Sequence, residues 1–536
     1  MVPMDAANGS DGRLPVYDAR TRRLLEGPIA ATLVRLAAPN VLVMVAQASV
    51  GLIETYFVAK LGSAALAGVA LVFPALMLMQ MMSGGAMGGG ISSAIARALG
   101  AGRRADADAL AVHAVAIAVI FGLAFSLGGL TGGRALYAAM GGSGRSLDAA
   151  LTYSNVIFAG AILVWSFNSL ANVIRGTGNM AVPAVVTCVG TAVLIPLSPA
   201  LIFGWGPFPQ LGISGGATAV VAFYALGTLA LLTYLAAGRS VVRLSLHGNG
   251  IRRTLFWDIL RVGAIAALVT LGTNLTIAIS TGLVGQLGSA AIAGYGTGAR
   301  LEYLLIPLVF GLGAPLVAMV GTCIGAGDRE RALRAAWIGA AIAAGLCEAI
   351  GVCAALFPTA WLGLFDSDPA MLEIGARYLR IVGPVYGLFG LGLALYFASQ
   401  GAGRLLWPVL ANLTRLTLAA VGGWLALRWH GDISAVFIAQ AVALAAFGAI
   451  VAAAVASGAW FVRRQRNECF SPKRAHRRDR RCGQVFACET NRTGRRRADR
   501  RFIRTVSAAS ATVPSTGKRG AGGARKSCSG NPDCLA

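Results

Sequence analysis

The chain alternates between long apolar runs and short polar connections. Between Gly176 and Gly238 there is no Asp, Glu, Lys or Arg, which leaves room for two membrane helices of roughly 20 residues and a turn. The backbone of a bilayer span must satisfy its own hydrogen bonds, and no alternating strand pattern is present, so the runs are predicted to be helices. About twelve spans are expected, near residues 30–56, 64–96, 108–131, 147–172, 179–203, 212–237, 255–284, 289–322, 333–357, 371–398, 404–427 and 432–458.

Composition agrees with an all-α integral membrane protein. The chain is 56% hydrophobic and 13% charged, whereas a soluble domain is about 25% charged. No phosphate-binding loop, zinc-type cysteine and histidine spacing, or nucleophile and base pair stands out. We therefore expect no metal site and no cofactor, and we expect a protein that is not an enzyme and is not driven by ATP.

The two halves of the chain repeat each other. The segment LGSAALAG at 61–68 returns as LGSAAIAG at 287–294, and Gly-Ala-Gly at 100–102 returns at 325–327. One constant separation also pairs Tyr153 with Tyr378, Gly176 with Gly401, Gly178 with Gly403 and Pro183 with Pro408. Two parallel six-helix repeats follow, because an even number of spans inserts both copies with the same orientation. Such repeats are typical of secondary transporters that alternate access between two halves.

Basic residues gather in the connections on one side of the predicted membrane. Because Lys and Arg mark the cytoplasmic side, both termini are predicted to be cytoplasmic, in a multi-pass protein of the cell (inner) membrane. The first thirty residues lack an apolar core, so no cleavable signal peptide is expected. The basic residues are Arg97, Arg103, Arg104, Arg239, Arg243, Arg252, Arg253, Arg329, Arg331 and Arg334.

Five segments are predicted along the chain. The last carries +15 of the net charge of +24 and lacks hydrophobic periodicity, which favours a disordered, solvated tail. Attraction of this tail to anionic lipids is the alternative; without a recognition motif, no nucleic-acid partner is expected. The partners are then a small-molecule substrate and the bilayer, and the protein is expected to be monomeric. The segments are 1–26 (cytoplasmic N-terminal segment), 27–238 (N-lobe), 239–254 (cytoplasmic linker), 255–460 (C-lobe) and 461–536 (basic tail).

Glu54 is the most informative single residue. Asn40, Gln47 and Glu54 recur every seven residues, which predicts a narrow stripe on the first helix. Placing a carboxyl group within a membrane span costs free energy, so we take Glu54 as a candidate functional residue. The alternative is a glutamate near the outer interface, since Lys60 follows closely. The second copy has Ser280 at the position of Glu54, so packing common to both repeats does not require the acid.

The second lobe carries its own charged residues within predicted spans: Glu302 preceded by Arg300, Glu348 and Arg415. Two interpretations remain open for them. They form an internal network that locks the lobe, or Glu302 belongs to a second ion site. Glu54 and Glu302 are thus the two candidates for ion coupling.

Several motifs resemble those of multidrug and toxic compound extrusion (MATE) transporters. They are the segment around Glu54, the LGSAALAG that follows it, the turns at 175–179 and 400–404, and the segment 201–213. The resemblance covers about residues 27–460. It implies a V-shaped twelve-helix fold of two lobes and export of amphipathic, often cationic compounds in exchange for H⁺ or Na⁺. The alternative is a flippase for lipid-linked precursors on the same superfamily fold.

The chain also departs from this family. The family usually carries Asp at the position of Glu54, and many members have Asn and Asp in the fifth helix, where this chain has Leu194 and Ser198. A proton relay between the first and fifth helices is therefore not supported. The residues expected to line the substrate cavity are Asn40, Gln47, Ser198 and Asn274.

Overall fold

The computed structural model describes residues 17–244, 252–365 and 367–461. Within them the chain is almost entirely helical and contains no strand. Residues 462–536 of the predicted tail and 245–251 of the predicted linker lie outside the described part.

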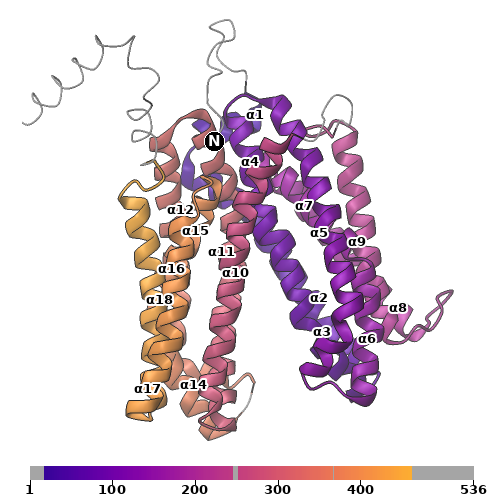
Figure 1. The fold of residues 1–536 in the computed structure, drawn as a ribbon, viewed down its shortest axis with the longest axis vertical. Coiled ribbons are helices and arrows are strands. Elements are labelled where there is room, and N and C mark those ends of the chain that lie inside the picture. The colour runs from indigo at the N-terminus through magenta and orange to yellow at the C-terminus, as the bar shows by residue number, and fades with distance from the viewer. Residues whose placement is uncertain (1–16, 245–251, 366, 462–536) are drawn as a thin grey trace, which may run out of the picture. The chain divides into compact units, whose positions relative to one another are not determined.

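The described residues of the first half form nine α-helices and one π-helical segment. The short α1 precedes the first long helix (Figure 1). The π-helical η1 interrupts the second long helix. The elements are α1 (Ala19–Glu26), α2 (Ile29–Ala59), α3 (Ser63–Gln80), η1 (Met81–Met87), α4 (Gly88–Gly100), α5 (Arg104–Ala139), α6 (Gly144–Ala159), α7 (Ala161–Gly176), α8 (Ala181–Phe203) and α9 (Ile213–Ala236).

The second half repeats this order, with short interruptions of its own in the fourth and fifth long helices. The elements are α10 (Arg253–Gly285), α11 (Ser289–Ala326), α12 (Arg329–Leu356), α13 (Pro358–Leu362), α14 (Pro369–Val382), the 3₁₀ segment η2 (Gly383–Val385), α15 (Tyr386–Gly401), α16 (Leu406–Thr417), the π-helical η3 (Leu418–Gly422), α17 (Gly423–His430) and α18 (Ile433–Ala456).

The described residues form eleven helices long and apolar enough to cross a membrane. A twelfth span results if α6 and α7, which meet at a bend of 49°, count as one. The prediction of an all-α membrane protein with about twelve spans is therefore confirmed.

The repeated motifs adopt the same backbone conformation in both halves. Gly62 and Gly288, which open the second helix of each repeat, both have φ of 106°. Gly102 and Gly327, which follow the same helix, have φ of 71° and 82°. A side chain is strained at positive φ, so each copy keeps glycine where the chain turns between helices.

The helices form two bundles, α2–α9 and α10–α18, which pack together near one end (Figure 1). There α4 and α11 touch along their backbones. A Cβ atom on Gly100 would lie 2.0 Å from the carbonyl oxygen of Thr322, and one on Gly325 would lie 2.2 Å from that of Arg97. Gly321 and Gly325 are spaced as in close membrane helix pairs, where small residues let two helices approach.

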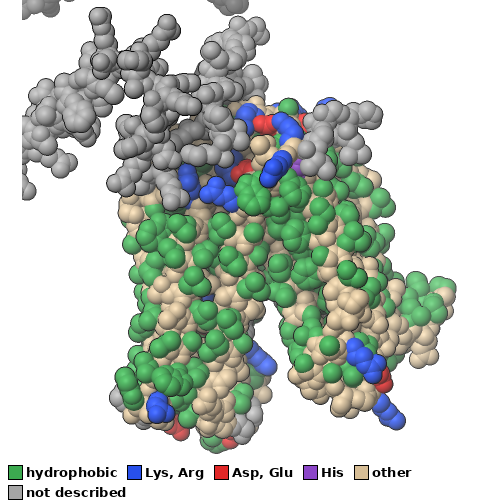
Figure 2. Space-filling model, in the orientation of Figure 1, with side chains coloured by type: hydrophobic (Ala, Val, Ile, Leu, Met, Phe, Trp, Pro, Cys, Tyr) green, Lys and Arg blue, Asp and Glu red, His purple; other side chains and the backbone are tan. Residues whose placement is uncertain are grey.

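Toward the other end the two bundles separate. Figure 2 shows an open cleft between them at that end. It also shows apolar side chains over most of the height of the molecule and Lys and Arg side chains mainly at its ends, as expected for a protein surrounded by lipid tails.

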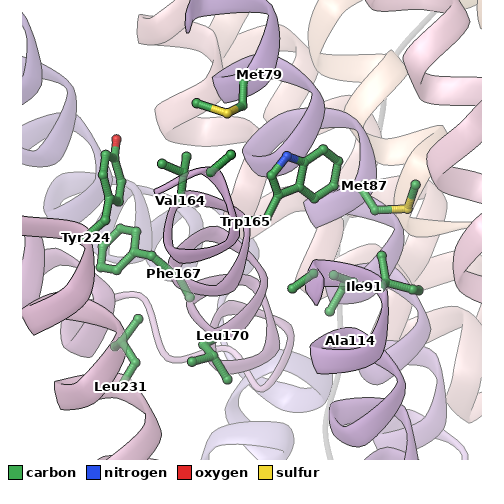
Figure 3. Packing of buried hydrophobic residues seen from close by; sticks show 14 of the residues in the cluster. Met79, Met87, Ile91, Ala114, Val164, Trp165, Phe167, Leu170, Tyr224 and Leu231 are labelled. Atoms are coloured by element: carbon green, nitrogen blue, oxygen red, sulfur yellow. The ribbon is translucent and has the colours of Figure 1, made fainter. Parts of the chain in front are cut away.

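Aromatic side chains fill the core of the first bundle. Trp165 of α7 stacks on Phe121 of α5 with ring centroids 5.2 Å apart. Phe167 meets Tyr224 of α9 edge to face at 5.6 Å (Figure 3). These contacts fix the rotation of α7 and α9, and they thereby place polar side chains of both helices inside the lobe.

Candidate functional site

Glu54 lies inside the first bundle, near the end of α2. Its Oε1 accepts a hydrogen bond of 2.7 Å from the hydroxyl of Tyr153 on α6. A Cβ atom added to Gly216 of α9 would lie 3.5 Å from the same oxygen, so α9 approaches the carboxylate from another side. In the part of the chain that the structure describes, no basic side chain forms an ion pair with Glu54.

A row of polar side chains continues from this carboxylate into the lobe. Tyr224 lies on α9, the helix whose Gly216 approaches Glu54. Its hydroxyl accepts a hydrogen bond from Nε2 of Gln80. The amide Nδ2 of Asn168, on α7, lies 3.2 Å from Oε1 of Gln80. Hydrogen bonds therefore join α3, α7 and α9 next to the acid.

The row ends on the π-helical segment η1. Asn168 also lies within 2.8 Å of Oγ of Ser83, and Asn172 donates to the carbonyl of Gly84 at 3.2 Å. π-Helical segments are rare and frequently occur at functional sites. Sequence reasoning missed Gln80, Asn168 and Asn172, although amide side chains within an uncharged span were an available signal.

The corresponding region of the second bundle is built differently. Arg415 of α16 donates to Oε1 of Glu302 on α11 at 2.8 Å, and both side chains are buried. Oε2 of the same glutamate accepts a hydrogen bond of 3.2 Å from Tyr378. The guanidinium of Arg415 also lies 5.0 Å from the ring centre of Phe389. The charge of Glu302 is thus balanced within the lobe.

Of the predicted network of Glu302 and Glu348 with Arg415, the structure contains the contact between Glu302 and Arg415. The carboxylate of Glu348 accepts a hydrogen bond of 2.7 Å from the backbone N–H of Gly387 instead. Arg300 is exposed, and its guanidinium lies 5.2 Å from the ring centre of Phe365. Glu348 and Arg300 therefore do not join the Glu302–Arg415 pair, because each has a different partner nearby.

The polar stripe predicted on the first helix does not face one environment. Asn40 is buried, and its Nδ2 donates to the carbonyl of Gly311 on α11 at 3.4 Å. Gln47, two turns further along, is exposed. Asn40 therefore lies in the contact between the two bundles, and Gln47 does not share that environment.

The other two residues predicted to line the cavity also differ from each other. Ser198 of α8 is buried, and its hydroxyl has no hydrogen-bond partner among the described residues. Asn274 of α10 is exposed and donates to the carbonyl of Thr270 at 2.8 Å. Of the four predicted residues, Gln47 and Asn274 are exposed in this structure, and Asn40 and Ser198 are buried.

A family model described as MatE matches the chain twice, over residues 39–200 and 266–425, which together make up more than half of it. A FAD transporter from Shewanella oneidensis is 28% identical, over 75% of this chain and 90% of that protein. A probable multidrug resistance protein NorM from Thermotoga maritima is 26% identical, over 72% and 83%. The multidrug export protein MepA from Staphylococcus aureus is 22% identical, over 72% and 85%.

Solved structures share the same fold. A transporter of the MOP superfamily from Pyrococcus furiosus superposes with a TM-score of 0.76 at 23% identity, over 83% of this chain and 98% of that one. A multidrug resistance MATE transporter in an outward-facing conformation gives 0.75 at 23% identity, over 82% and 99%. These relatives are transporters rather than enzymes, and the same family model matches each half of the chain. The chain belongs to the MatE family of multi-pass membrane transporters.

Proposed function

We propose that the protein is a secondary active antiporter that exports amphipathic, cationic compounds in exchange for H⁺ or Na⁺. Both termini lie in the cytoplasm in this proposal, so the open cleft faces outward. Membership of a family of efflux transporters supports the reaction class.

The proposal rests on the difference between two acids inside the lobes, the half-buried Glu54 and the buried Glu302. Glu54 has a tyrosine hydroxyl as its partner at 2.7 Å and no basic partner among the described residues. Glu302 is held at 2.8 Å by Arg415. A carboxylate that lacks a fixed cation can bind and release an ion, whereas a paired one holds its charge in place. Glu54 is therefore the proposed coupling residue and Glu302 a structural one.

The coupling follows from competition at one carboxylate. A bound H⁺ or Na⁺ neutralises Glu54 and removes its attraction for a cationic compound, while a bound cationic compound opposes ion binding by the same free energy. The hydrogen bonds from Tyr153 and along the row of Tyr224, Gln80 and Asn168 hold the surrounding helices in place, so a change of charge at Glu54 acts on a defined set of contacts.

The test is transport of a fluorescent cationic dye in proteoliposomes, with a pH gradient or a Na⁺ gradient imposed separately. Glu54→Gln is expected to abolish gradient-driven transport, and Glu54→Asp to retain part of it because the charge survives. Glu348→Gln is the matched control, since it also neutralises a partly buried membrane glutamate and should leave coupling intact. Transport at the wild-type rate by Glu54→Gln, together with loss in folded Glu302→Gln, would instead locate coupling in the second lobe.

A second candidate is export of an anionic, phosphate-bearing compound. It is supported by the similarity to a FAD transporter over 90% of that protein and by the exposed Arg300 on α11. The same proteoliposomes loaded with FAD separate the two candidates, because a carrier for cationic compounds should move the dye and leave the dinucleotide behind. Movement of a labelled lipid-linked precursor between leaflets in the same vesicles would favour the flippase alternative.

A further inference from the structure

The short helix α1 forms one wall of a cavity at the end where the two bundles meet. Leu24 on its buried face packs against Gly178, at 2.9 Å from the position of an added Cβ atom. Arg331 of α12 donates to the carbonyls of Leu24, at 3.0 Å, and of Gly27. The hydroxyl of Tyr17 donates to the carbonyl of Gly100 at 3.0 Å. Contacts to both bundles therefore hold this wall in place.

The cavity has a volume of about 780 Å³ and is lined by α1, the first part of α2 and the turn between α7 and α8. Four arginines line it, and Glu26 is the one acidic residue among its described lining. Glu26 is already paired with Arg22 at 2.8 Å. Arg20, Arg23 and Arg35 are exposed, and no acidic residue in the described ranges forms an ion pair with any of them. The cavity is thus complementary to a negatively charged group.

A separate apolar groove begins on α8, one helical turn from the cavity. Ala181 lines the cavity, and Val185, one turn further along the same face, begins a groove of about 290 Å³ between α8 and α9. Its lining contains only Val, Leu, Ala, Gly and Phe residues. From Val185 to Leu197 the groove is roughly 18 Å long, at about 1.5 Å per helical residue. One leaflet of a bilayer has a hydrocarbon thickness of about 15 Å.

We propose that an anionic phospholipid binds here, with its phosphate headgroup in the arginine-lined cavity and an acyl chain in the groove between α8 and α9. The exposed Val185 and Val189 place the groove on the surface of α8, where lipid tails are available. Basic pockets between membrane helices are known to bind acidic headgroups. A soluble phosphate compound would use the arginines but leave the adjoining groove unexplained, so the pair of features favours a lipid.

The test uses the full-length protein in phosphatidylcholine nanodiscs that contain a small fraction of phosphatidylglycerol with a photoreactive diazirine in its acyl chain. After irradiation, modified peptides are identified by mass spectrometry. Adducts are expected on the groove walls in α8 and α9. The triple variant R20Q/R23Q/R35Q is expected to lower their yield at least tenfold. The control R239Q/R243Q/R253Q removes three exposed charges outside the cavity and should leave the yield unchanged. Every variant keeps residues 461–536, so any attraction of that basic segment for anionic lipid is common to all.

Three results would overturn the proposal. One is an adduct yield that is the same in the cavity variant as in the wild type. Another is equal labelling of the groove by photoreactive phosphatidylcholine, which would show that the arginines select nothing. The third is loss of the groove adduct when FAD or pyrophosphate is added at a concentration that leaves the labelling of the other helices unchanged, in the wild type and in R239Q/R243Q/R253Q. That result would assign the cavity to a soluble phosphate compound. Size-exclusion profiles that match the wild type show that each variant is folded.

Discussion

Tyr153 donates its hydroxyl to Glu54 at 2.7 Å, and Tyr378, its counterpart in the second repeat, donates to Glu302 at 3.2 Å. The tyrosines occupy equivalent positions, but the acids do not. Glu54 comes from the first long helix of its repeat, and Glu302 from the second. The two lobes thus use one inherited hydrogen-bond donor for two different carboxylates, and only the second carboxylate also has an arginine.

Tyr153→Phe is expected to lower gradient-driven transport about tenfold or more. A hydrogen bond to a charged group contributes about 1.5–3 kcal/mol, and no other hydrogen-bond donor to Glu54 is described. Tyr378→Phe is the matched control and should stay near the wild-type rate, because Glu302 keeps Arg415. Initial rates in proteoliposomes at equal protein content check this; equal losses in the two variants would contradict the asymmetry between the lobes.

Glu302→Gln and Arg415→Met are each expected to destabilise the protein, since removing one member of a buried ion pair costs about 3–5 kcal/mol. The double variant leaves no unpaired charge and keeps an acceptor for Tyr378, so it should recover most of the loss. The melting temperatures of the wild type, the two single variants and the double variant in detergent test this prediction. Strictly additive effects of the two substitutions would show that the pair is not coupled.

Arg97 of α4 and Asp258 of α10 join the two bundles at 2.9 Å. Asp258 is about half exposed, and such pairs contribute up to about 1 kcal/mol. Arg97→Asp should therefore raise the population of molecules open at this end by roughly fivefold, and the exchanged pair R97D/D258R should reverse most of the change. The readout is maleimide labelling of Thr322→Cys in a background without other cysteines, because Thr322 is buried and its backbone lies against Gly100 in the contact between the bundles. Equal labelling of the wild type, R97D and R97D/D258R would show that the Arg97–Asp258 pair does not hold the two bundles together at this end.

The loop charges predict the orientation in the membrane. A reporter that matures only in the cytoplasm should give signal when fused after Phe461 or inserted after His247, and none when inserted between Asp366 and Asp368, because Arg-rich connections remain on the cytoplasmic side. Cell fluorescence at matched expression checks the three fusions. A silent fusion after Phe461 would refute the twelve-span arrangement with both termini inside.

The sequence alone determined the class of protein, the spans and the duplication. Bilayer thickness and the need to pair every backbone group leave few alternatives for long apolar runs. The repeated Gly62 and Gly288 share one backbone conformation, and such local features can be predicted because they depend on neighbouring residues. Glu54 could also be singled out as a candidate, since a carboxyl group within an apolar span has a high cost in free energy.

Only the tertiary structure decided which side chains meet. Tyr153 is 99 positions from Glu54, and Arg415 is 113 positions from Glu302. Such contacts depend on how each helix is rotated in its bundle, and a shift of one residue turns a side chain by about 100°. Asn40 and Gln47 share a predicted stripe, yet α11 buries the first and leaves the second exposed. The partner of each polar group is therefore a property of helix packing, which periodicity along one helix does not contain.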